Sequence, residues 1–473
     1  MKADLPVDFM RRYFILPDGE GRFFITENTP FFIVEDLRFT FGKVETVLVD
    51  EETFNEKMED YISSLESRLE EGEEAEGAIF EDLLAGSDAP IIQLLNTIFL
   101  KAIKVGASDI HFEPYERDVI VKFRLDGVLH EVTRIPFSSY PKVVSRVKVI
   151  SRLNVAEKRL PQDGRIKVRI GKKQIDMRVS TLPTVFGERV VIRLLDRSHK
   201  LLTLKELGFS DRDHAVFEDV ITKPHGLILV TGPTGSGKTT TLYAAIQRIW
   251  TPEKNILTVE DPVEYQMEGI NQVQVNPKIG LTFAAGLRSI LRQDPDVIMI
   301  GEIRDLETAE IAVRASMTGH LVFSTLHTND APSSIARLTD MGVEPFLVAS
   351  SLECVLAQRL VRRVCSHCAF EYEPTEEELK TIHSVLGDVN VVRLKRGKGC
   401  ERCLGTGYSG RIAIYQVMKI DEEMRALISR TSDTEKIREL AKKRGMRTLL
   451  EDGMEKVLSG ITTVEEVLQV ARD

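Results

Sequence analysis

The chain has 473 residues, which is too many for one hydrophobic core, so we expect about three or four domains. Hydrophobic residues make up 42% of it and charged residues 29%, as in ordinary soluble globular proteins. No stretch approaches the ~18 consecutive apolar residues of a membrane-spanning helix, and the start lacks a signal-peptide pattern. We therefore expect a cytoplasmic protein, held at a membrane only through partners.

Charge is distributed unevenly along the chain, although the net charge is a modest −10. Tyr140 to Lys200 contain sixteen Lys/Arg against five Asp/Glu, whereas Glu66 to Asp82 contain eight acids against one arginine. The acidic run over 70–77 has too little apolar content to fold alone and is typical of a solvated linker. We place a linker over residues 69–85.

Residues 1–68 predict a small α/β unit ahead of this linker. Strands are expected at 23–25, 31–34 and 44–49, and a helix from Glu52 to Leu69. This segment contains no catalytic constellation of side chains. We interpret residues 1–68 as a partner-docking domain.

Residues 86–200 predict an α+β domain with many arginines on its strands. An amphipathic helix over Ile91–Val105 precedes two strands that Asp126 and Gly127 join, a hairpin signal. The expected strands lie at 119–124, 128–132, 166–170, 174–179 and 189–194.

Residues 201–355 alternate strands and helices, which is the pattern of a parallel sheet covered on both faces. The expected strands lie at 227–231, 255–260, 297–301 and 321–325. Ligands bind at the carboxyl ends of such strands, so the polar residues that follow them are candidates for a nucleotide site. Two cysteine pairs then lie in residues 356–415, and residues 416–473 predict a C-terminal helical domain.

A glycine-rich loop follows the first of these strands and precedes a helical stretch over 240–249. It fills every position of the G-x-x-x-x-G-K-[ST] phosphate-binding pattern in the strand–loop–helix context that the pattern requires. Lys238 would reach the β- and γ-phosphates, and the Thr239 hydroxyl would hold Mg²⁺. The predicted nucleotide-binding residues are Gly232, Pro233, Thr234, Gly235, Ser236, Gly237, Lys238, Thr239 and Thr240. The chain is predicted to bind and hydrolyse a nucleoside triphosphate.

Acidic residues follow two of the other expected strands. A carboxylate within 260–264 could orient a water molecule for in-line attack on the γ-phosphate, although an acid-rich capped turn is the simpler alternative. Glu302 ends a buried strand, as the second metal-supporting element of P-loop enzymes does. Because it is Glu rather than Asp, we expect its contact with Mg²⁺ to be mediated by water.

Histidines and arginines complete the candidate constellation. His320 and His327 bracket the strand over 321–325 and are either structural hydrogen-bonding groups or sensors of the γ-phosphate. Arg178 and Arg193 lie on neighbouring predicted strands of the basic domain, where a guanidinium could neutralise phosphate charge. Most arginines on a basic sheet are simply solvated.

Four of the five cysteines form two C-x-x-C pairs, Cys365 with Cys368 and Cys400 with Cys403, separated by 31 residues. In a reducing cytoplasm such pairs favour a tetrathiolate Zn²⁺ site over disulfides. Cys354, on an apolar stretch, is predicted to be a buried small residue.

Together these motifs resemble the secretion ATPases of the type II secretion and type IV pilus assembly family. The resemblance rests on the glycine-rich loop, the acidic box 256–264, the segment 291–305, the histidine box 318–330 and the segment 107–114. It runs from about residue 86 to the end of the chain. The occurrence of all these boxes in one chain is highly specific for this family.

The resemblance implies a hexameric ATPase in which a PAS-like domain (residues 86–200) and a RecA-like domain (residues 201–355) clamp ATP. By motif position, Glu264 would be the catalytic base and Glu302 the Walker B acid. His320 and His327 would flank the γ-phosphate, and Arg178 and Arg193 would close on it. The cysteine element is carried by the assembly members of the family, so assembly is favoured over retraction.

We therefore predict a cytoplasmic, peripheral inner-membrane motor that hydrolyses ATP to drive pseudopilus assembly and protein export in type II secretion. Pilus extension is the near alternative. The predicted partners are further copies in a homohexamer, an inner-membrane platform protein, and the cytoplasmic domain of an inner-membrane assembly protein that residues 1–68 would bind. A nucleic-acid motor is less favoured, because the basic strands lack interleaved aromatic residues. A scaffold that binds ATP without turnover is the remaining alternative.

Overall fold

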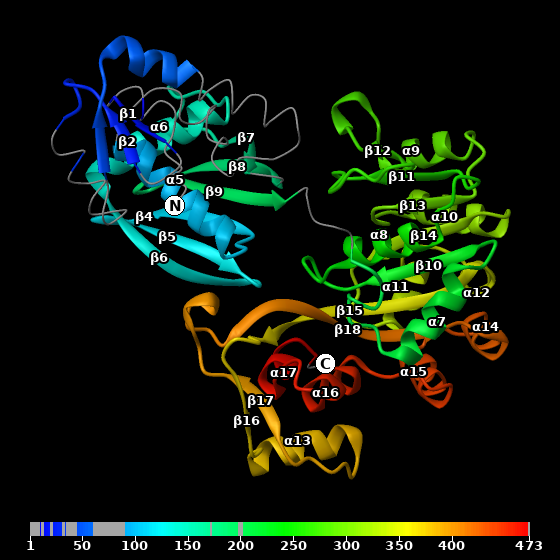
Figure 1. Cartoon of the computed structure of the whole chain (residues 1–473). Coiled ribbons are helices and arrows are strands. Elements are labelled where there is room, and N and C mark those ends of the chain that lie inside the picture. Colours follow the sequence, from blue (N-terminus) through cyan, green and yellow to red (C-terminus); the bar gives the residue numbers. More distant parts are fainter. Residues whose placement is uncertain are drawn as a thin grey trace. The chain divides into compact units, whose positions relative to one another are not determined.

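The computed structural model describes residues 10, 14–18, 22–30, 34, 45–59, 90–170, 173–196 and 202–471. The chain divides into two compact units, residues 1–199 and 200–473, and each is described here by itself (Figure 1). Among the described residues, no helix combines the length and apolar character needed to cross a membrane.

The start of the first unit contains a small three-stranded sheet in the order β1-β2-β3. The strands are β1 (Ile15–Pro17), β2 (Arg22–Ile25) and β3 (Glu45–Leu48), with β1 antiparallel and β3 parallel to β2. Two of the three predicted strands are confirmed. Of the third, at 31–34, only Val34 is described, and it is helical. Residues 51–59 form a helix; the rest of the predicted helix and the acidic linker lie outside the described residues.

A larger antiparallel sheet of six strands, in the order β6-β5-β4-β9-β8-β7, forms the rest of the first unit. Its strands are β4 (Asp109–Pro114), β5 (Asp118–Leu125), β6 (Val128–Pro136), β7 (Gln162–Ile170), β8 (Lys173–Thr184) and β9 (Gly187–Asp196). Helices α5 (Pro90–Lys104) and α6 (Tyr140–Ile150), with the 3₁₀ turn η1 (Phe137–Ser139) before α6, complete it. Sequence reasoning did not predict β4 or α6.

One face of this sheet carries the core of the unit. Alternate strand residues such as Phe112, Phe123 and Ile192 are fully buried and cluster with Phe99 of α5 and Val147 of α6. The predicted hairpin turn is confirmed, with Asp126 and Gly127 both at positive φ. The α+β prediction is therefore confirmed, whereas the PAS-like relationship stays a prediction.

The second unit is organised around a seven-stranded sheet in the order β12-β11-β13-β14-β10-β15-β18 (Figure 1). Its parallel strands are β10 (Gly226–Thr231), β11 (Ile256–Glu260), β12 (Asn271–Gln274), β13 (Val297–Ile300), β14 (Leu321–Leu326) and β15 (Leu352–Val364). The seventh, β18 (Tyr408–Lys419), is antiparallel to β15. All four predicted strands of this segment are confirmed.

Helices cover both faces of this sheet because successive strand residues point to opposite sides. Leu227 and Leu229 belong to a core with α9 (Phe283–Ile290), α10 (Leu306–Met317), α11 (Ser333–Asp340) and α12 (Pro345–Ser351). Ile228 and Val230 belong to a second core with α7 (Asp211–Ile221) and α8 (Lys238–Ile249). A 3₁₀ turn, η2 (Pro277–Ile279), precedes α9.

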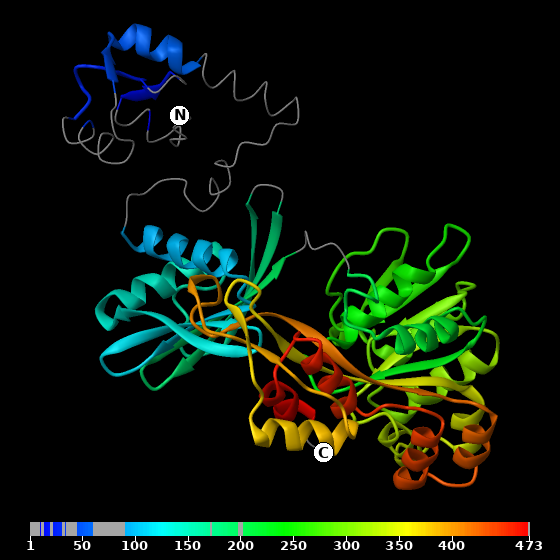
Figure 2. The same ribbon diagram turned by 60° about the horizontal axis from the view of Figure 1, so that its bottom comes forward.

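The C-terminal part of the second unit follows β15 in the chain. Its elements are β16 (Ala369–Tyr372), α13 (Glu376–Leu386), β17 (Leu394–Gly397), η3 (Glu401–Cys403), α14 (Glu422–Ile428), α15 (Thr434–Lys443), α16 (Leu449–Leu458) and α17 (Val464–Ala471). Helices α13, α16 and α17 pack beside one another (Figure 2). The boundary predicted at residue 355 falls inside β15, and β18 joins the sheet from beyond it. The helical C-terminal region is confirmed.

Candidate functional site

The glycine-rich loop lies between β10 and α8, at the carboxyl edge of the parallel sheet. Gly237, the N-cap of α8, has a φ of +87°, and Gly232 has a φ of +151°. A Cβ atom at Gly232 would lie 2.5 Å from the carbonyl oxygen of Gln358 on the adjacent strand β15. Glycine is required at both positions, because L side chains rarely adopt this backbone and no space exists for one at Gly232.

The loop has polar groups that suit a phosphate ligand. The Ser236 hydroxyl is buried and has no hydrogen-bond partner among the described residues. Lys238 is 9% exposed, and its ammonium donates to the carbonyl oxygens of Gly232 (2.7 Å) and Pro233 (3.0 Å). An orphaned donor, a buried cation and a helix N-terminus together fit the phosphates of a nucleotide. Thr239 and Thr240, in the first turn of α8, are half-buried beside them.

Burial is the main influence on the protonation of Lys238. It lowers the pKa of the ammonium below its ordinary value, the Arg359 charge lowers it further, and Glu302 partly opposes both. A phosphate anion at this position would restore the missing negative charge and favour the protonated lysine.

Glu302, Arg304 and His327 form a charged cluster at the same edge of the sheet. Arg304 pairs with one carboxylate oxygen of Glu302, and His327 Nε2 lies 3.3 Å from the other. Burial raises the pKa of Glu302, but Arg304 and His327 outweigh it, and the net pKa lies below the usual value. Glu302 is therefore ionised at neutral pH and beside the strand end where a phosphate-bound cation would lie.

Glu264 lies in the loop that follows β11, which ends at the same edge of the sheet. Its side chain is half-buried, and its backbone N–H lies 3.4 Å from the hydroxyl of Tyr243 on α8. The structure thus places Glu264 beside the helix that follows the glycine-rich loop.

The two histidines do not share a site within the second unit. His327 follows the carboxyl end of β14, whereas His320 precedes its first residue and accepts a hydrogen bond from the N–H of Gly226 through its backbone oxygen. Six residues of extended strand separate them by about 20 Å. The ring of His320 lies 2.9 Å from the carbonyl oxygen of Ala315, a structural contact. Within one chain β14 therefore separates the two rings, and that both flank the γ-phosphate stays a prediction.

Arg178 and Arg193 lie side by side on β8 and β9 of the first unit, where they are register partners. Arg165 on β7 is in turn the partner of Arg178, so three arginines form a row across the face opposite the core. The row lines a cavity of about 430 Å³ together with Asp163 and Ser180. Asp109 pairs with Arg193 at 3.0 Å and anchors one end. Sequence reasoning missed Arg165, although its alternation with the buried Ile166 could have indicated it.

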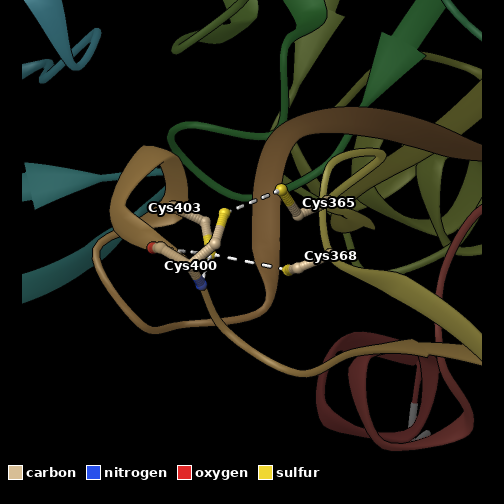
Figure 3. A group of neighbouring side chains, drawn as sticks. All are labelled: Cys365, Cys368, Cys400 and Cys403. Carbon is tan, nitrogen blue, oxygen red and sulfur yellow. Dashed lines mark hydrogen bonds between the residues drawn. The ribbon is translucent and has the colours of Figure 1, made fainter.

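The four paired cysteines converge in the second unit (Figure 3). Their sulfur atoms all lie within 4.8 Å of one another, with Cys365–Cys400 at 4.0 Å, Cys368–Cys403 at 3.9 Å and Cys400–Cys403 at 3.7 Å. A tetrahedral site with Zn–S bonds of about 2.3 Å requires sulfur separations of about 3.8 Å. The donor set and its spacing therefore fit a tetrathiolate metal site.

The antiparallel pairing of β16 with β17 brings Cys368 to the second pair, since Ala369 lies opposite Gly397. A Cβ at Gly397 would lie 2.1 Å from the carbonyl oxygen of Gly407, so the two chain segments can approach only as glycines. Burial raises the pKa of Cys403, but the backbone N–H groups of Cys400 and Gly407 outweigh it and lower the pKa to about 6. Burial raises the pKa of the neighbouring Cys368 to about 12, so in the absence of a metal Cys403 is the thiolate and Cys368 the thiol. A thiolate is the form that a metal binds.

Cys354 lies apart from the cluster and is fully buried. Burial raises the pKa of its thiol to about 12. The prediction that it is a small core residue is confirmed.

Comparisons with known proteins identify the family to which these motifs belong. A family model described as "Type II/IV secretion system protein" matches residues 85–469. The chain is 53% identical over 394 residues to "Type II secretion system protein E" of Pseudomonas aeruginosa, which covers 83% of this chain and 78% of that protein. It is 47% identical over 452 residues to "Type IV pilus assembly ATPase PilB" of Myxococcus xanthus, which covers 92% and 80%.

A similar solved structure is the pilus retraction motor PilT with bound ADP, with a TM-score of 0.53 and 27% identity. The match covers 80% of this chain and 96% of that one. Since the family model spans most of the chain and relatives exceed half identity over four fifths of it, the chain belongs to the family of type II/IV secretion system proteins.

Proposed function

We propose that this chain is the ATPase that drives pseudopilus assembly and protein export in type II secretion. The observation that carries this proposal is the phosphate cradle between β10 and α8, with Lys238 and the unpaired Ser236 hydroxyl in place, in a chain of this family. Relatives named as type II secretion protein E favour the secretion branch. Relatives named PilB keep pilus extension as the second candidate.

In this proposal the side chains around the cradle divide the reaction between them. Lys238 and the backbone N–H groups of 234–240 bind the β- and γ-phosphates, and Thr239 is the Mg²⁺ ligand. Glu264 orients and deprotonates the attacking water. Glu302 acts as the Walker B acid, and His327, which lies beside it, senses the γ-phosphate. Bound Mg²⁺ supplies charge neutralisation to the phosphates.

The cysteine cluster is proposed to hold one Zn²⁺ through Cys365, Cys368, Cys400 and Cys403. Its chemistry would be structural: four protein ligands leave no open coordination position for a substrate or water. The metal would join the end of β15 to the start of β18, two strands of the sheet that carries the nucleotide site.

Assembly and location follow from the same family. We propose a homohexamer in the cytoplasm, peripheral on the inner membrane through partners. Residues 1–68 would dock on the cytoplasmic domain of an inner-membrane assembly protein, and the motor would act on an inner-membrane platform protein. No nucleic-acid partner is expected.

The arginine row gives a test of the proposed phosphate contacts. Arg178→Gln and Arg193→Gln are each expected to lower kcat for ATP hydrolysis by about tenfold or more, because each removes a guanidinium that stabilises transferred phosphate charge. Arg134→Gln is the matched control, since Arg134 lies on β6 of the same sheet in surface ion pairs with Asp118 and Glu131. Steady-state ATPase assays measure the effect. Equal activities of all three variants would contradict the assignment.

The secretion branch is tested in the organism that encodes the chain. Replacing the gene with a Lys238→Ala version is expected to abolish export of secreted proteins and to leave surface pili in normal number. The amount of secreted protein in the culture medium and the number of pili per cell are measured in the same cultures. Loss of pili with normal export would move the motor to pilus extension.

A further inference from the structure

A buried polar cluster links the helix after the glycine-rich loop to the loop that carries Glu264. At its centre is Glu260, the last residue of β11, which is only 2% exposed. One carboxylate oxygen accepts hydrogen bonds from the Thr258 hydroxyl at 2.6 Å and from the Gln272 amide at 3.1 Å. The other accepts a hydrogen bond from the hydroxyl of Tyr243. Because all three donors are already engaged with it, Glu260 is built to hold neighbours rather than to take a proton from water.

Gln272, on the neighbouring strand β12, ties the acidic loop to the same cluster. Its amide nitrogen donates to the carbonyl oxygen of Tyr265 at 2.9 Å, and its amide oxygen accepts from the N–H of Met267 at 2.8 Å. These contacts fix the backbone on the far side of Glu264. On its near side, the chain is fixed at Glu260 by the pairing of β11 with β12, in which Glu260 lies opposite Gln274.

Tyr243 makes the third contact that holds the acidic loop, and it lies on the helix that follows the glycine-rich loop. It lies on α8, five positions after Lys238, and its side chain is fully buried. Its hydroxyl also lies 3.4 Å from the backbone N–H of Glu264, and its ring meets that of Tyr265 edge-on at 6.0 Å. One rigid helix thus has the phosphate-binding lysine in its first turn and the contact to the acidic loop in its second.

A buried carboxylate with polar partners contributes little net stability to a sheet edge, because its desolvation is costly and apolar residues of similar volume often stabilise equally well or better. Such a cluster fixes one geometry, since each donor and acceptor must meet its partner. We propose that Tyr243, with Glu260 and Gln272, is a positioning residue for ATP hydrolysis that holds Glu264 at a fixed place relative to the phosphates bound by α8. The inference rests on the proposed role of Glu264.

Tyr243→Phe tests the proposal, since it removes one hydroxyl and keeps the ring. We expect kcat to fall by about tenfold, because a base displaced by a fraction of an ångström loses its alignment with the water. KM for ATP is expected to change by less than about twofold, because the phosphate contacts of Lys238 are untouched. Tyr372→Phe is the matched control and is expected to leave kcat unchanged. The hydroxyl of Tyr372 also donates to a glutamate, Glu378, but Tyr372 lies on β16, in the cysteine element.

A double-mutant comparison separates positioning from a general effect on the fold. If Tyr243 acts through Glu264, Tyr243→Phe has no further effect on the residual kcat of Glu264→Gln. Gln272→Ala is expected to behave like Tyr243→Phe in both backgrounds. Thermal unfolding of each variant is measured alongside, and melting temperatures well above the assay temperature are expected for all of them.

Four results would overturn the inference. These are a kcat of Tyr243→Phe within twofold of the natural chain, a tenfold loss that repeats in the Glu264→Gln background, a rise in KM in place of a fall in kcat, or a loss of kcat that tracks partial unfolding. If Glu264→Gln itself keeps full turnover, the proposed role of Glu264 fails. This is a separate result from an unchanged kcat in Tyr243→Phe with an inactive Glu264→Gln, which overturns the positioning role alone.

Discussion

Replacing Glu264 with glutamine is expected to lower kcat for ATP hydrolysis by about 10²- to 10⁴-fold, the contribution of a positioned general base. Glutamine keeps the size and hydrogen-bonding capacity of the side chain but cannot accept the proton of the attacking water. ATP binding should survive, because Lys238 and the glycine-rich loop are unchanged. Single-turnover hydrolysis and a nucleotide-binding assay on the same preparation measure the two quantities.

Glu268→Gln is the matched control for this variant. Glu268 lies in the same loop, four positions later, and its side chain is exposed. It is expected to keep turnover within about twofold of the natural chain, as surface substitutions generally do. If Glu264→Gln behaves like Glu268→Gln, Glu264 is not the base, and another carboxylate of the acidic box must be sought.

Substituting one cysteine of the cluster is expected to have the second large effect. Cys403→Ser should reduce bound zinc from about one ion per chain to less than about a tenth, since a structural site depends on all four thiolates. The segment between β15 and β18 should then become more sensitive to proteolysis, because the four cysteines tie the end of β15 to η3. Metal analysis and limited proteolysis measure these effects, and dialysis against a chelator should reproduce them.

Cys354→Ala provides the control, because it removes a thiol that lies outside the cluster and inside the core. It is expected to cost about 1 kcal/mol of stability, the order expected for a small cavity, and to leave zinc content unchanged. Equal zinc content in Cys403→Ser and Cys354→Ala would show that the cluster is not the metal site.

Motifs with short spacing could be predicted directly from the sequence. The glycine-rich loop, the two C-x-x-C pairs and the Asp126-Gly127 turn are local patterns whose chemistry depends on neighbours within a few residues. Each of them lies in the structure where its pattern indicates, with Gly237 at the N-cap of α8 and the four sulfur atoms together. The parallel sheet was also predictable, since its buried strands are continuous apolar runs.

Features that depend on strand register could not be predicted in the same way. His320 and His327 are seven residues apart and bracket a strand, but only the sheet shows that one of them lies at the edge away from the glycine-rich loop. Arg165, Arg178 and Arg193 are widely separated in the chain and become a row only through the pairing of β7 with β8 and β8 with β9. The end of the sheet was misplaced because β18 is more than forty residues beyond β15 and returns to it as an antiparallel strand.

By itself, the sequence determined that this protein has a phosphate-binding loop, a pair of candidate metal-binding motifs and the family signature that joins them. The tertiary structure alone decided which side chains meet one another at the same edge of the sheet: Glu302 with His327, and Tyr243 with Glu260 and Gln272. The reason is physical. Local spacing specifies backbone conformation and ligand chemistry within one turn or loop, whereas contacts between strands and helices depend on how buried apolar faces pack, and packing is a property of the whole fold.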